Sequence, residues 1–370
     1  MSAPTITRLV VRRIDALMPR PWVPAAPWMH LLAVEVETSD GIIGQGFSWT
    51  PTIGAEAVEA LLNNDIRRFV VGKTADPREL WQQLWVNLHE AGGGGLTTIA
   101  IAGLDLALWD AAGQRHQLPL VDLLGRRRDS VAAYGSGVNL HYSLDELRQQ
   151  VQRWVDTGYS TVKIKVGLPS LAEDVRRVAA VREVLGPERR LLIDANQRWD
   201  LETAVTAVGE LSQFDLGWIE EPLRAEDTQG YIALAGRIDV PIALGENLHT
   251  IHRFRDFLAT GAISVLQPNV IRVGGITPFL DIAELVSTSD ATLAPHLLPE
   301  ISGQLALALD AEVEVEDVEQ AGFADLGILA DDGPVTFERG RLRESAKHPG
   351  LGLRFTHPDH ARPLASQLQP

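Results

Sequence analysis

The chain has 370 residues, 45% of them hydrophobic, and its 33 basic and 49 acidic side chains give a formal net charge of -16. A chain of this length can bury a large domain and a smaller partner, while the negative charge repels polyanions and argues against nucleic-acid binding. Cysteine is absent, which excludes a disulfide framework, a thiolate nucleophile and a Cys-ligated zinc site, so any metal must be bound by oxygen or imidazole.

The N-terminal region lacks the pattern of a secretory signal, because no basic segment precedes an apolar run with a small-residue cleavage site. We therefore expect a cytoplasmic protein. Residues 6–12 and 31–37 alternate apolar and polar side chains, and Ser39-Asp40-Gly41 is typical of a hairpin turn, so we predict an antiparallel sheet. Between these strands, the proline-rich residues 18–30 predict a lid loop.

Helical periodicity follows at residues 55–62, 77–88 and 98–113, with Gly113 predicted to end the last helix. The apolar stretch 96–109 is interrupted by polar side chains and is too short to cross a bilayer, so we expect a buried helix there. The strands and helices together predict an α+β capping domain.

From residue 130 onward, short apolar runs each precede a helix-length amphipathic segment. The runs are VAAYG, TVKIKVG, RLLIDAN, LGWIEEP, PIALGEN, ISVLQPN and ATLAPH. This βα repeat suits a parallel barrel. An open doubly wound sheet also alternates, but no Gly-x-Gly-x-x-Gly turn follows the first strand, which favours closure. We predict an α/β barrel of the modified TIM type, (β/α)7β, over residues 129–326, with a capping domain formed by residues 1–128 and a C-terminal segment, 327–370, that returns to it.

Acidic side chains lie at the ends of three consecutive predicted strands, as Asp194, Glu220 and Glu246. Barrels of this kind carry their chemistry at the C-terminal strand ends, so we expect these carboxylates to converge at the mouth. Three hard oxygen donors suit Mg²⁺ and leave positions open for water or substrate. A single acid would more simply cap the following helix, but three in register favour a metal site.

Two lysines, Lys163 and Lys165, lie two residues apart on one predicted strand and therefore point to the same face. Because Val162, Ile164 and Val166 face the other way, we expect the lysines inside the barrel, where the carboxylates compensate them. A lysine that is crowded by another cation and partly desolvated has a lowered pKa, which suits a base near neutral pH. An exposed edge strand with a solvated lysine pair is the alternative.

Two further candidates lie farther along the chain. His296, in PHLLPEIS, follows the seventh predicted strand and would face Lys165 across the mouth, although a lone histidine is more often structural. Glu316, in the acidic run AEVEVEDVE, is the next candidate around the ring, with a charged, solvated segment as the alternative.

The motifs KIKVG, DANQ, WIEEP, GEN, RVGGIT and PHLLPEIS, in this order and spacing, resemble those of the mandelate racemase subgroup of the enolase superfamily. The resemblance runs from the N-terminal region to about Glu316. The phrases GIIGQGFS and RVGGITPFL, with the lid loop, look closest to acid-sugar dehydratases that act on talarate or galactarate. The resemblance implies a Mg²⁺-dependent enzyme that removes the proton next to a carboxylate through an enediolate intermediate.

The resemblance also implies a role for each matching residue. These roles are Mg²⁺ ligation by Asp194, Glu220 and Glu246, acid/base catalysis by Lys165 and His296, contacts to the substrate carboxylate from Lys163 and Glu316, and a place beside the metal for Asn196. In the lid, we expect Arg20, Trp22 and His30 to close over the distal end of the substrate, with Arg20 or His30 meeting a second carboxylate. A plain surface loop is the alternative.

One position departs from the family pattern. The strand before the histidine strand normally ends in an aspartate that pairs with the histidine, whereas this chain has Asn269 there. A neutral amide cannot stabilise an imidazolium, and if it donates to the ring it enforces the other tautomer. The corresponding change in a Ser-His-Asp triad costs about 10⁴ in rate. We expect His296 to act chiefly as an acid or hydrogen-bond donor, with Lys165 as the principal base.

These residues leave several functions open. With a hydroxyl on the β-carbon, the intermediate expels it to give a 2-keto-3-deoxy acid, so dehydration of an acid sugar is the leading hypothesis. Racemisation or epimerisation needs two competent bases, which Asn269 disfavours, and lactone cycloisomerisation uses the same intermediate. A non-catalytic barrel that binds an acid sugar is the alternative outside enzymes. We expect a small carboxylate ligand, no nucleic-acid or membrane partner, and a homo-oligomer.

Overall fold

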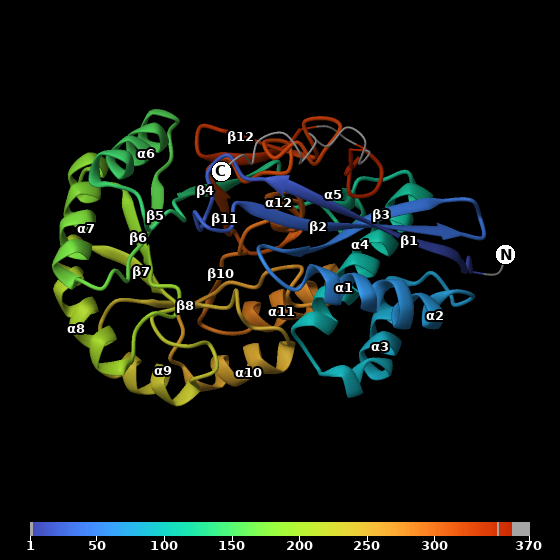
Figure 1. Cartoon of the computed structure of the whole chain (residues 1–370), viewed down its shortest axis with the longest axis horizontal. Helices are drawn as coiled ribbons and strands as arrows, with labels where there is room; N and C mark the ends of the chain where they lie inside the picture. Colours follow the sequence, from blue (N-terminus) through green and yellow to red (C-terminus); the bar gives the residue numbers. More distant parts are fainter. Residues whose placement is uncertain (1–2, 346–347, 357–370) are drawn as a thin grey trace.

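The computed structural model describes residues 3–345 and 348–356, and within them the chain forms two parts that lie side by side (Figure 1). The N-terminal part is a capping domain of one sheet and several helices. The second part is a barrel whose helices lie outside its strands. A single large hydrophobic core includes residues of both parts.

The capping sheet has three antiparallel strands, in the order β1 (Ile6–Leu17), β2 (Trp28–Thr38) and β3 (Ile43–Thr50). The loop between β1 and β2 covers residues 18–27, so the predicted lid loop 18–30 extends too far. His30 already pairs with Asp15 in the sheet. The reason is that the last proline of the loop is Pro27, and the residues after it have backbone N–H groups that can join the sheet.

The helices of this domain are α1 (Ala55–Leu61), the π-helix η1 (Leu62–Ile66), α2 (Arg67–Val70), α3 (Pro77–Asn87), the 3-10 helix η2 (His89–Ala91) and α4 (Leu96–His116). Asp76 caps α3, because its side chain accepts a hydrogen bond from the N–H of Glu79 at 2.8 Å. Helix α4 packs directly on β3, since a Cβ atom at Gly44 or Gly46 would lie 2.0 Å or 2.4 Å from backbone atoms of Ala107.

Helix α4 is long and apolar enough to cross a membrane, but 83% of its apolar window is buried inside the protein. It is therefore a buried helix of the protein core, as expected for residues 96–109. The predicted end at Gly113 is wrong, because the helix continues to His116 and ends at Gln117, whose φ of 56° is left-handed. Gly113 instead permits close packing, since a Cβ atom there would lie 2.6 Å from the Cα of Gly350.

In the described part of the chain, the barrel contains eight parallel strands and seven helices that alternate along the sequence. The strands are β4 (Ser130–Ser136), β5 (Thr161–Lys165), β6 (Arg190–Asp194), β7 (Leu216–Glu220), β8 (Ile242–Leu244), β9 (Val265–Leu266), β10 (Thr292–Leu293) and β11 (Glu314–Val318). The helices are α6 (Leu144–Asp156), α7 (Leu171–Leu185), α8 (Leu201–Leu211), α9 (Thr228–Ala235), α10 (Ile251–Thr260), α11 (Ile276–Ser287) and α12 (Pro299–Ala308).

Two shorter helices complete this region, as α5 (Leu120–Leu123) precedes β4 and the 3-10 helix η3 (Ser212–Phe214) follows α8. Each strand from β4 to β9 pairs in parallel with the next strand, and β11 pairs in parallel with β4. The last strand therefore returns beside the first. The predicted (β/α)7β barrel is confirmed.

Apolar side chains fill the barrel below its mouth. They form a separate cluster that consists of Tyr134, Leu192, Trp218, Ala243, Val265 and Ala294. Leu192 and Trp218 lie two residues before Asp194 and Glu220, so they point to the same interior face as these acids. The polar residues at the strand ends therefore lie directly above a layer of apolar side chains.

The chain after the barrel contacts both parts. The antiparallel strands β12 (Val335–Glu338) and β13 (Arg341–Glu344) follow β11, and β13 pairs with the start of β4. The N–H of Leu351 then donates to Oδ1 of Asp110 on α4 at 2.6 Å. Residues 346–347 and 357–370 of the predicted C-terminal segment lie outside the described residues.

Asp105 on α4 links the capping domain to the start of α11. It is 2% exposed, and its carboxylate accepts hydrogen bonds from the N–H of Thr277 at 3.0 Å and from its Oγ1–H at 2.6 Å. Burial raises the pKa of Asp105 to about 7. The folded protein therefore keeps a proton on this carboxyl that the unfolded chain releases near pH ~4.

We expect this carboxyl to lower the free energy of unfolding as the pH rises from about 4 to about 7, because the unfolded state loses the proton first. The effect of one such group is at most about 1.4 kcal/mol per pH unit. Urea unfolding across this pH range should show a smaller fall in the free energy of unfolding for Asp105→Asn than for the wild type. The amide of the variant can still bond to both Thr277 groups. An unchanged slope would contradict the raised pKa.

Candidate active site

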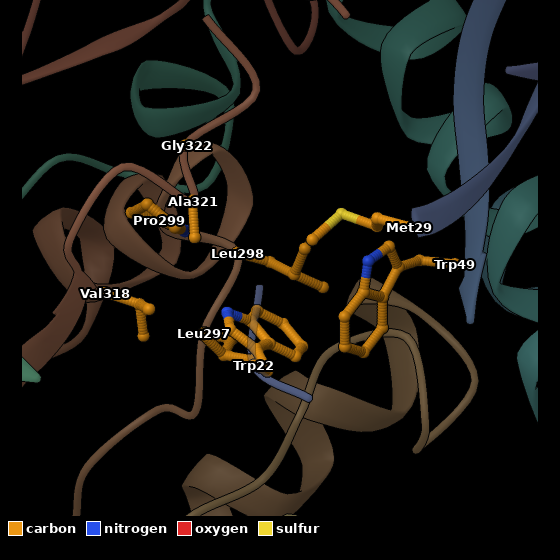
Figure 2. Close-up of a pocket in the computed structure, with 9 residues that line it drawn as sticks. All are labelled: Trp22, Met29, Trp49, Leu297, Leu298, Pro299, Val318, Ala321 and Gly322. Atoms are coloured by element: carbon orange, nitrogen blue, oxygen red, sulfur yellow. The ribbon is translucent and has the colours of Figure 1, made fainter. Parts of the chain in front are cut away.

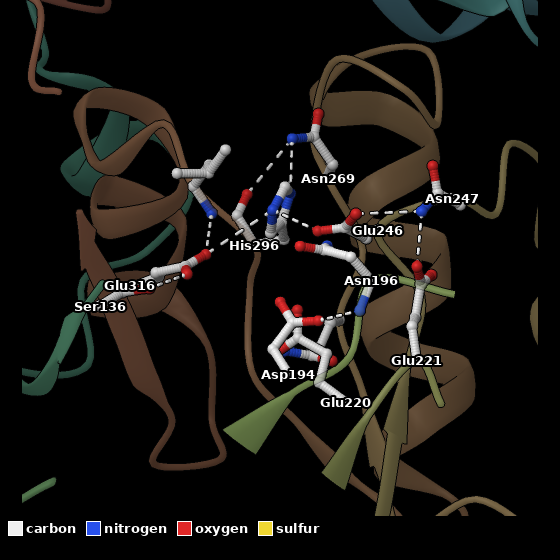
Figure 3. A network of polar contacts seen from close by, with 12 residues as sticks. Ser136, Asp194, Asn196, Glu220, Glu221, Glu246, Asn247, Asn269, His296 and Glu316 are labelled. Atoms are coloured by element: carbon white, nitrogen blue, oxygen red, sulfur yellow. Dashed lines mark hydrogen bonds and ion pairs between the residues drawn. The ribbon is translucent and has the colours of Figure 1, made fainter. Parts of the chain in front are cut away.

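Three carboxylates meet at the mouth of the barrel (Figure 3). Asp194 and Glu220 end the paired strands β6 and β7 and lie opposite each other in register, and Glu246 follows the end of β8. One ligand oxygen from each of the three lies within 4.8 Å of the others, and all three residues are buried. The backbone N–H of Asn196 donates to Oδ1 of Asp194 at 2.8 Å. The structure thus brings together the acids that the sequence pattern indicated.

The chemistry of this cluster suits a divalent cation. Burial and the negative charge of Asp194 raise the pKa of Glu220 to about 8. The Oε1 atom of Glu220 is buried and has no hydrogen-bond partner among the described residues. Like charges at this spacing, with one oxygen unsatisfied, favour a bound cation, and an all-oxygen donor set fits Mg²⁺.

Lys163 and Lys165 extend from β5 into the same pocket. Nζ of Lys163 lies 2.7 Å from Oε2 of Glu220 and 2.8 Å from Oε1 of Glu316. Nζ of Lys165 forms an ion pair with Asp194. The two lysines are 1% and 8% exposed, which excludes a solvated lysine pair on an edge strand.

The expected lowering of the lysine pKa values is wrong for this arrangement. Burial lowers the pKa of Lys165, and Lys163 lowers it further, but the charges of Asp194, Glu246 and Glu220 together outweigh both and the net pKa is raised. Burial also opposes the charged form of Lys163, yet Glu220 and Glu316 hold its pKa well above the usual value. The carboxylates in contact with each ammonium group, and not the second lysine, therefore decide its protonation.

His296 follows β10 and lies between two acids (Figure 3). Its Nε2 atom is 2.7 Å from Oε2 of Glu246 and 3.8 Å from Oε2 of Glu316. Glu316 is 2% exposed and accepts hydrogen bonds from Oγ of Ser136 at 2.7 Å and from the N–H of Leu297 at 3.1 Å. Burial alone would raise its pKa, but Lys163, His296 and the hydrogen bond from Ser136 together lower the pKa to about 2. Glu316 is thus a buried anion and not part of a solvated segment.

Asn269 determines which ring nitrogen of His296 carries the hydrogen. One side-chain atom of Asn269 faces the N–H groups of Ile271 at 3.0 Å and Arg272 at 3.1 Å, and since both groups can only donate, that atom is the oxygen. The amide nitrogen therefore donates to Nδ1 of His296 at 3.0 Å (Figure 3). The hydrogen of the neutral ring then lies on Nε2, the atom that faces Glu246.

We expect Asn269→Asp to move this hydrogen to Nδ1, because a carboxylate can only accept. His296 would then lose its Nε2–H donor, and turnover should fall by about 100-fold, the lower end of what one positioned proton donor contributes. NMR of the imidazole nitrogens in the Mg²⁺-loaded enzyme reports the tautomer, and kinetics report the rate. A faster variant would mean that the missing negative charge limits His296.

The sequence did not point us to the polar side chains that hydrogen-bond to the acids at the mouth of the barrel. Nε2 of Gln267 donates to Glu220 at 2.8 Å, and Nδ2 of Asn247 donates to Glu221 at 2.6 Å and to Glu246 at 3.0 Å. Glu221 is buried beside the cluster. All of them stand at the ends of the predicted strands, in WIEEP, GEN and VLQPN, so this position is the signal that could have indicated them.

The three lid candidates lie in different places. Trp22 lines a cavity together with Trp49 of β3 and Leu297 (Figure 2). Nε of Arg20 lies 3.2 Å from Oε2 of Glu319, and Nδ1 of His30 lies 2.6 Å from Oδ1 of Asp15 in the capping sheet. In the described part of the chain, neither Arg20 nor His30 belongs to the lining of this cavity.

Comparison with known proteins yields relatives of known activity. An L-talarate/galactarate dehydratase from Salmonella typhimurium is 38% identical over 337 residues, which cover 90% of this chain and 81% of that enzyme. A 3,6-anhydro-alpha-L-galactonate cycloisomerase from Streptomyces coelicolor is 38% identical over 268 residues, which cover 72% of this chain and 74% of that enzyme.

Solved structures and family patterns agree with these relatives. A racemase from Streptomyces coelicolor with bound magnesium has a TM-score of 0.88 at 31% identity, over 95% of this chain and 97% of that chain. An L-talarate dehydratase from Polaromonas sp., complexed with Mg and L-glucarate, has a TM-score of 0.84 at 37% identity, over 96% of each chain. Residues 15–125 match the mandelate racemase / muconate lactonizing enzyme N-terminal domain, and residues 146–359 match the enolase C-terminal domain-like family. The chain therefore belongs to the mandelate racemase / muconate lactonizing enzyme family of the enolase superfamily.

Proposed function

We propose that this protein is a Mg²⁺-dependent acid-sugar dehydratase, which converts a sugar acid to a 2-keto-3-deoxy acid. One observation carries the proposal: Asp194, Glu220 and Glu246 place ligand oxygens within 4.8 Å of one another, and a lysine is ion-paired with the first of them. The dehydratase names of relatives and the magnesium in solved neighbours support it.

Asp194, Glu220 and Glu246 are the residues that would hold Mg²⁺. When bound, the cation supplies positive charge that stabilises the substrate carboxylate as negative charge builds up on it, and it offsets the charge of Asp194 that otherwise raises the pKa of Lys165. The ammonium group of Lys163 adds a second fixed positive charge for the same carboxylate. Glu220 and Glu316 hold this group in place at 2.7 Å and 2.8 Å.

Lys165 accepts the α-proton at Nζ, and the electron pair of the broken C–H bond forms the enediolate. The intermediate then expels the β-hydroxyl, which leaves as water with the proton that Lys165 has taken up. The remaining enol loses its hydroxyl proton to solvent and takes up a proton at the former β-carbon, which gives the 2-keto acid. His296 donates a hydrogen bond from Nε2 toward the leaving oxygen, in line with the tautomer that Asn269 imposes. Both groups are buried at the mouth, where water competes little for these hydrogen bonds.

Cycloisomerisation is the second candidate, because one relative is named as a cycloisomerase and the same intermediate can expel a ring oxygen instead of a hydroxide. Racemisation or epimerisation fits less well. It needs a base on each face of the α-carbon, and His296 presents a hydrogen rather than a lone pair at Nε2. A non-catalytic barrel would have no use for a buried lysine beside three acids, which disfavours a purely binding function.

The proposal includes a cytoplasmic location and a homo-oligomeric assembly. The net charge of -16 is consistent with a protein that binds a small acid and not a polyanion.

A library of mono- and diacid sugars, incubated with the protein and Mg²⁺ and assayed for 2-keto acids, tests the proposal. At least one acid should yield a 2-keto acid and lose water, as seen by mass spectrometry. A product with the mass of the substrate would identify an isomerase or cycloisomerase instead. No reaction with any acid, at saturating Mg²⁺, would overturn the proposed activity.

A further inference from the structure

Arg272 lies in the turn that follows β9, and β9 pairs with β8 on one side and with β10 on the other. The residue is half-buried. Glu246 follows β8 and His296 follows β10, so this turn lies between the third proposed metal ligand and the histidine of the site. Arg272 forms hydrogen bonds toward both neighbours, one set through its side chain and one through its backbone.

The side chain of Arg272 orients the amide of Asn247. Its Nη1 atom donates to the backbone carbonyl of Glu246 at 3.0 Å and to the side-chain oxygen of Asn247. Because a guanidinium group can only donate, the oxygen of this amide must face Arg272. The NH2 group then faces the other way and donates to Oε1 of Glu246 at 3.0 Å and to Oε2 of Glu221 at 2.6 Å (Figure 3).

The backbone of Arg272 orients a second amide in the same sense. Its N–H donates to Oδ1 of Asn269 at 3.1 Å, and the NH2 group of that amide donates to Nδ1 of His296 at 3.0 Å (Figure 3). The hydrogen on Nε2 of the ring then faces Oε2 of Glu246 at 2.7 Å. Arg272 therefore faces the oxygens of two asparagines and directs both NH2 groups toward the mouth of the barrel.

These contacts close a ring of hydrogen bonds around Glu246, which is 8% exposed. Its Oε1 atom accepts from Asn247 and its Oε2 atom from His296, so both oxygens of this carboxylate are held. The donors and acceptors agree all the way round the ring, which consists of Glu246, Asn247, Arg272, Asn269 and His296. A carboxylate that is fixed before a cation arrives loses less side-chain entropy on binding it.

We infer that Arg272 is a positioning residue for the proposed metal site and for the ring of His296. Its side chain acts on Glu246 through the amide of Asn247, and its backbone sets the tautomer of the histidine through Asn269. This inference rests on the proposed function in taking Mg²⁺ as the bound cation. Its tests measure cation binding and the tautomer, so they do not depend on turnover.

Calorimetric titration of Arg272→Met with Mg²⁺ tests the role of the side chain. Methionine keeps an unbranched apolar stem but removes the donors. We expect the Kd for Mg²⁺ to rise by about 10-fold or more, the lower end of what an outer partner of a metal ligand contributes. Charge alone predicts the opposite sign, because removal of a nearby cation reduces the repulsion of a divalent ion.

NMR of the imidazole nitrogens separates the side chain from the backbone. In Arg272→Met the N–H groups of Ile271 and residue 272 still face Asn269, so the hydrogen of the neutral His296 ring should stay on Nε2. A collapse of the whole turn would weaken Mg²⁺ binding and change the tautomer together. Weaker Mg²⁺ binding with an unchanged tautomer is thus the signature of the inferred role.

Arg182→Met is the matched control. Arg182 is also half-buried and joins two loops through neutral oxygens, but at the other end of the barrel. Its guanidinium group donates to carbonyls that precede β6 and β7, those of Gly186, Arg189, Phe214 and Asp215. This variant should keep the wild-type Kd for Mg²⁺.

A second variant, Asn247→Ala, tests the link between Arg272 and Glu246. It leaves the turn after β9 intact and should also raise the Kd for Mg²⁺ by about 10-fold. If the side chain of Arg272 acts through this amide, the effect of Arg272→Met should be at least about 3-fold smaller in the Asn247→Ala background than in the wild type. Equal effects in both backgrounds would contradict the link.

The outcomes separate the inference from the proposed function. An unchanged or tighter Kd in a folded Arg272→Met protein would overturn the inference and leave the dehydratase function intact, and so would a change of tautomer in that variant. If Arg272→Met does not fold, Asn247→Ala decides alone, and a wild-type Kd there would reject the inference. A wild-type protein that binds no Mg²⁺ would overturn the proposed function, and the inference would fall with it.

Discussion

Replacing Lys165 by methionine should lower kcat by roughly 10²–10⁴-fold, the contribution typical of one positioned general base. Methionine keeps the length of the side chain but offers no group that accepts a proton. The KM should change less than kcat, because the variant keeps Lys163, which binds the substrate carboxylate, and the three acids that would hold Mg²⁺. Steady-state kinetics with an acid identified by the screen measure both quantities.

The control for this variant is the effect of Mg²⁺ on its thermal unfolding. The rise in Tm on adding Mg²⁺ should persist, since Asp194, Glu220 and Glu246 are intact. A folded Lys165→Met enzyme that retains more than about a tenth of the wild-type kcat would assign proton removal to another residue.

The second large effect is expected at the metal site. Glu220→Gln should weaken Mg²⁺ binding by more than about 100-fold, since even the outer partners of a metal contribute 10–100-fold. The amide keeps the oxygen that Lys163 and Gln267 contact but removes the charge. In the wild type, Mg²⁺ at 100 times its Kd should raise the free energy of unfolding by about 2.7 kcal/mol, and at the same concentration the variant should show little of this rise.

Asp105→Asn is the matched control, because it also converts a buried carboxyl of raised pKa into an amide, but in the capping domain. It should keep the full response to Mg²⁺. If Glu220→Gln bound Mg²⁺ as tightly as Asp105→Asn, the three acids at the mouth would not be the metal site.

Most of the barrel could be predicted because its periodicity is local. The strands are short and mostly apolar, and each strand from β4 to β10 is followed by a helix. The end of α4 could not be predicted in this way, because Gly113 is required for close packing against Gly350, a contact between distant parts of the sequence. The strands β12 and β13 were also missed, since they are short, partly exposed and lie in a glycine-rich segment.

The three acids of the metal site could also be predicted from the sequence, for a related reason. Parallel neighbours end at the same edge, so residues at the ends of β6 and β7 must lie close together, as Asp194 and Glu220 do. The direction of the lysine pKa shifts could not be predicted, because it depends on which carboxylate each Nζ contacts. The orientation of Asn269 likewise depends on the backbone N–H groups of Ile271 and Arg272, which no periodic pattern indicates.

Hydrogen exchange at the α-carbon of a 3-deoxy sugar acid tests the central claim most directly, because this acid lacks the leaving hydroxyl and shows proton removal alone. In deuterated water with Mg²⁺, proton NMR should show the wild-type enzyme replacing the α-hydrogen by deuterium. Exchange should stop in a chelator and in Lys165→Met. Exchange that continues without Mg²⁺, or at the wild-type rate without the lysine amine, would contradict the mechanism.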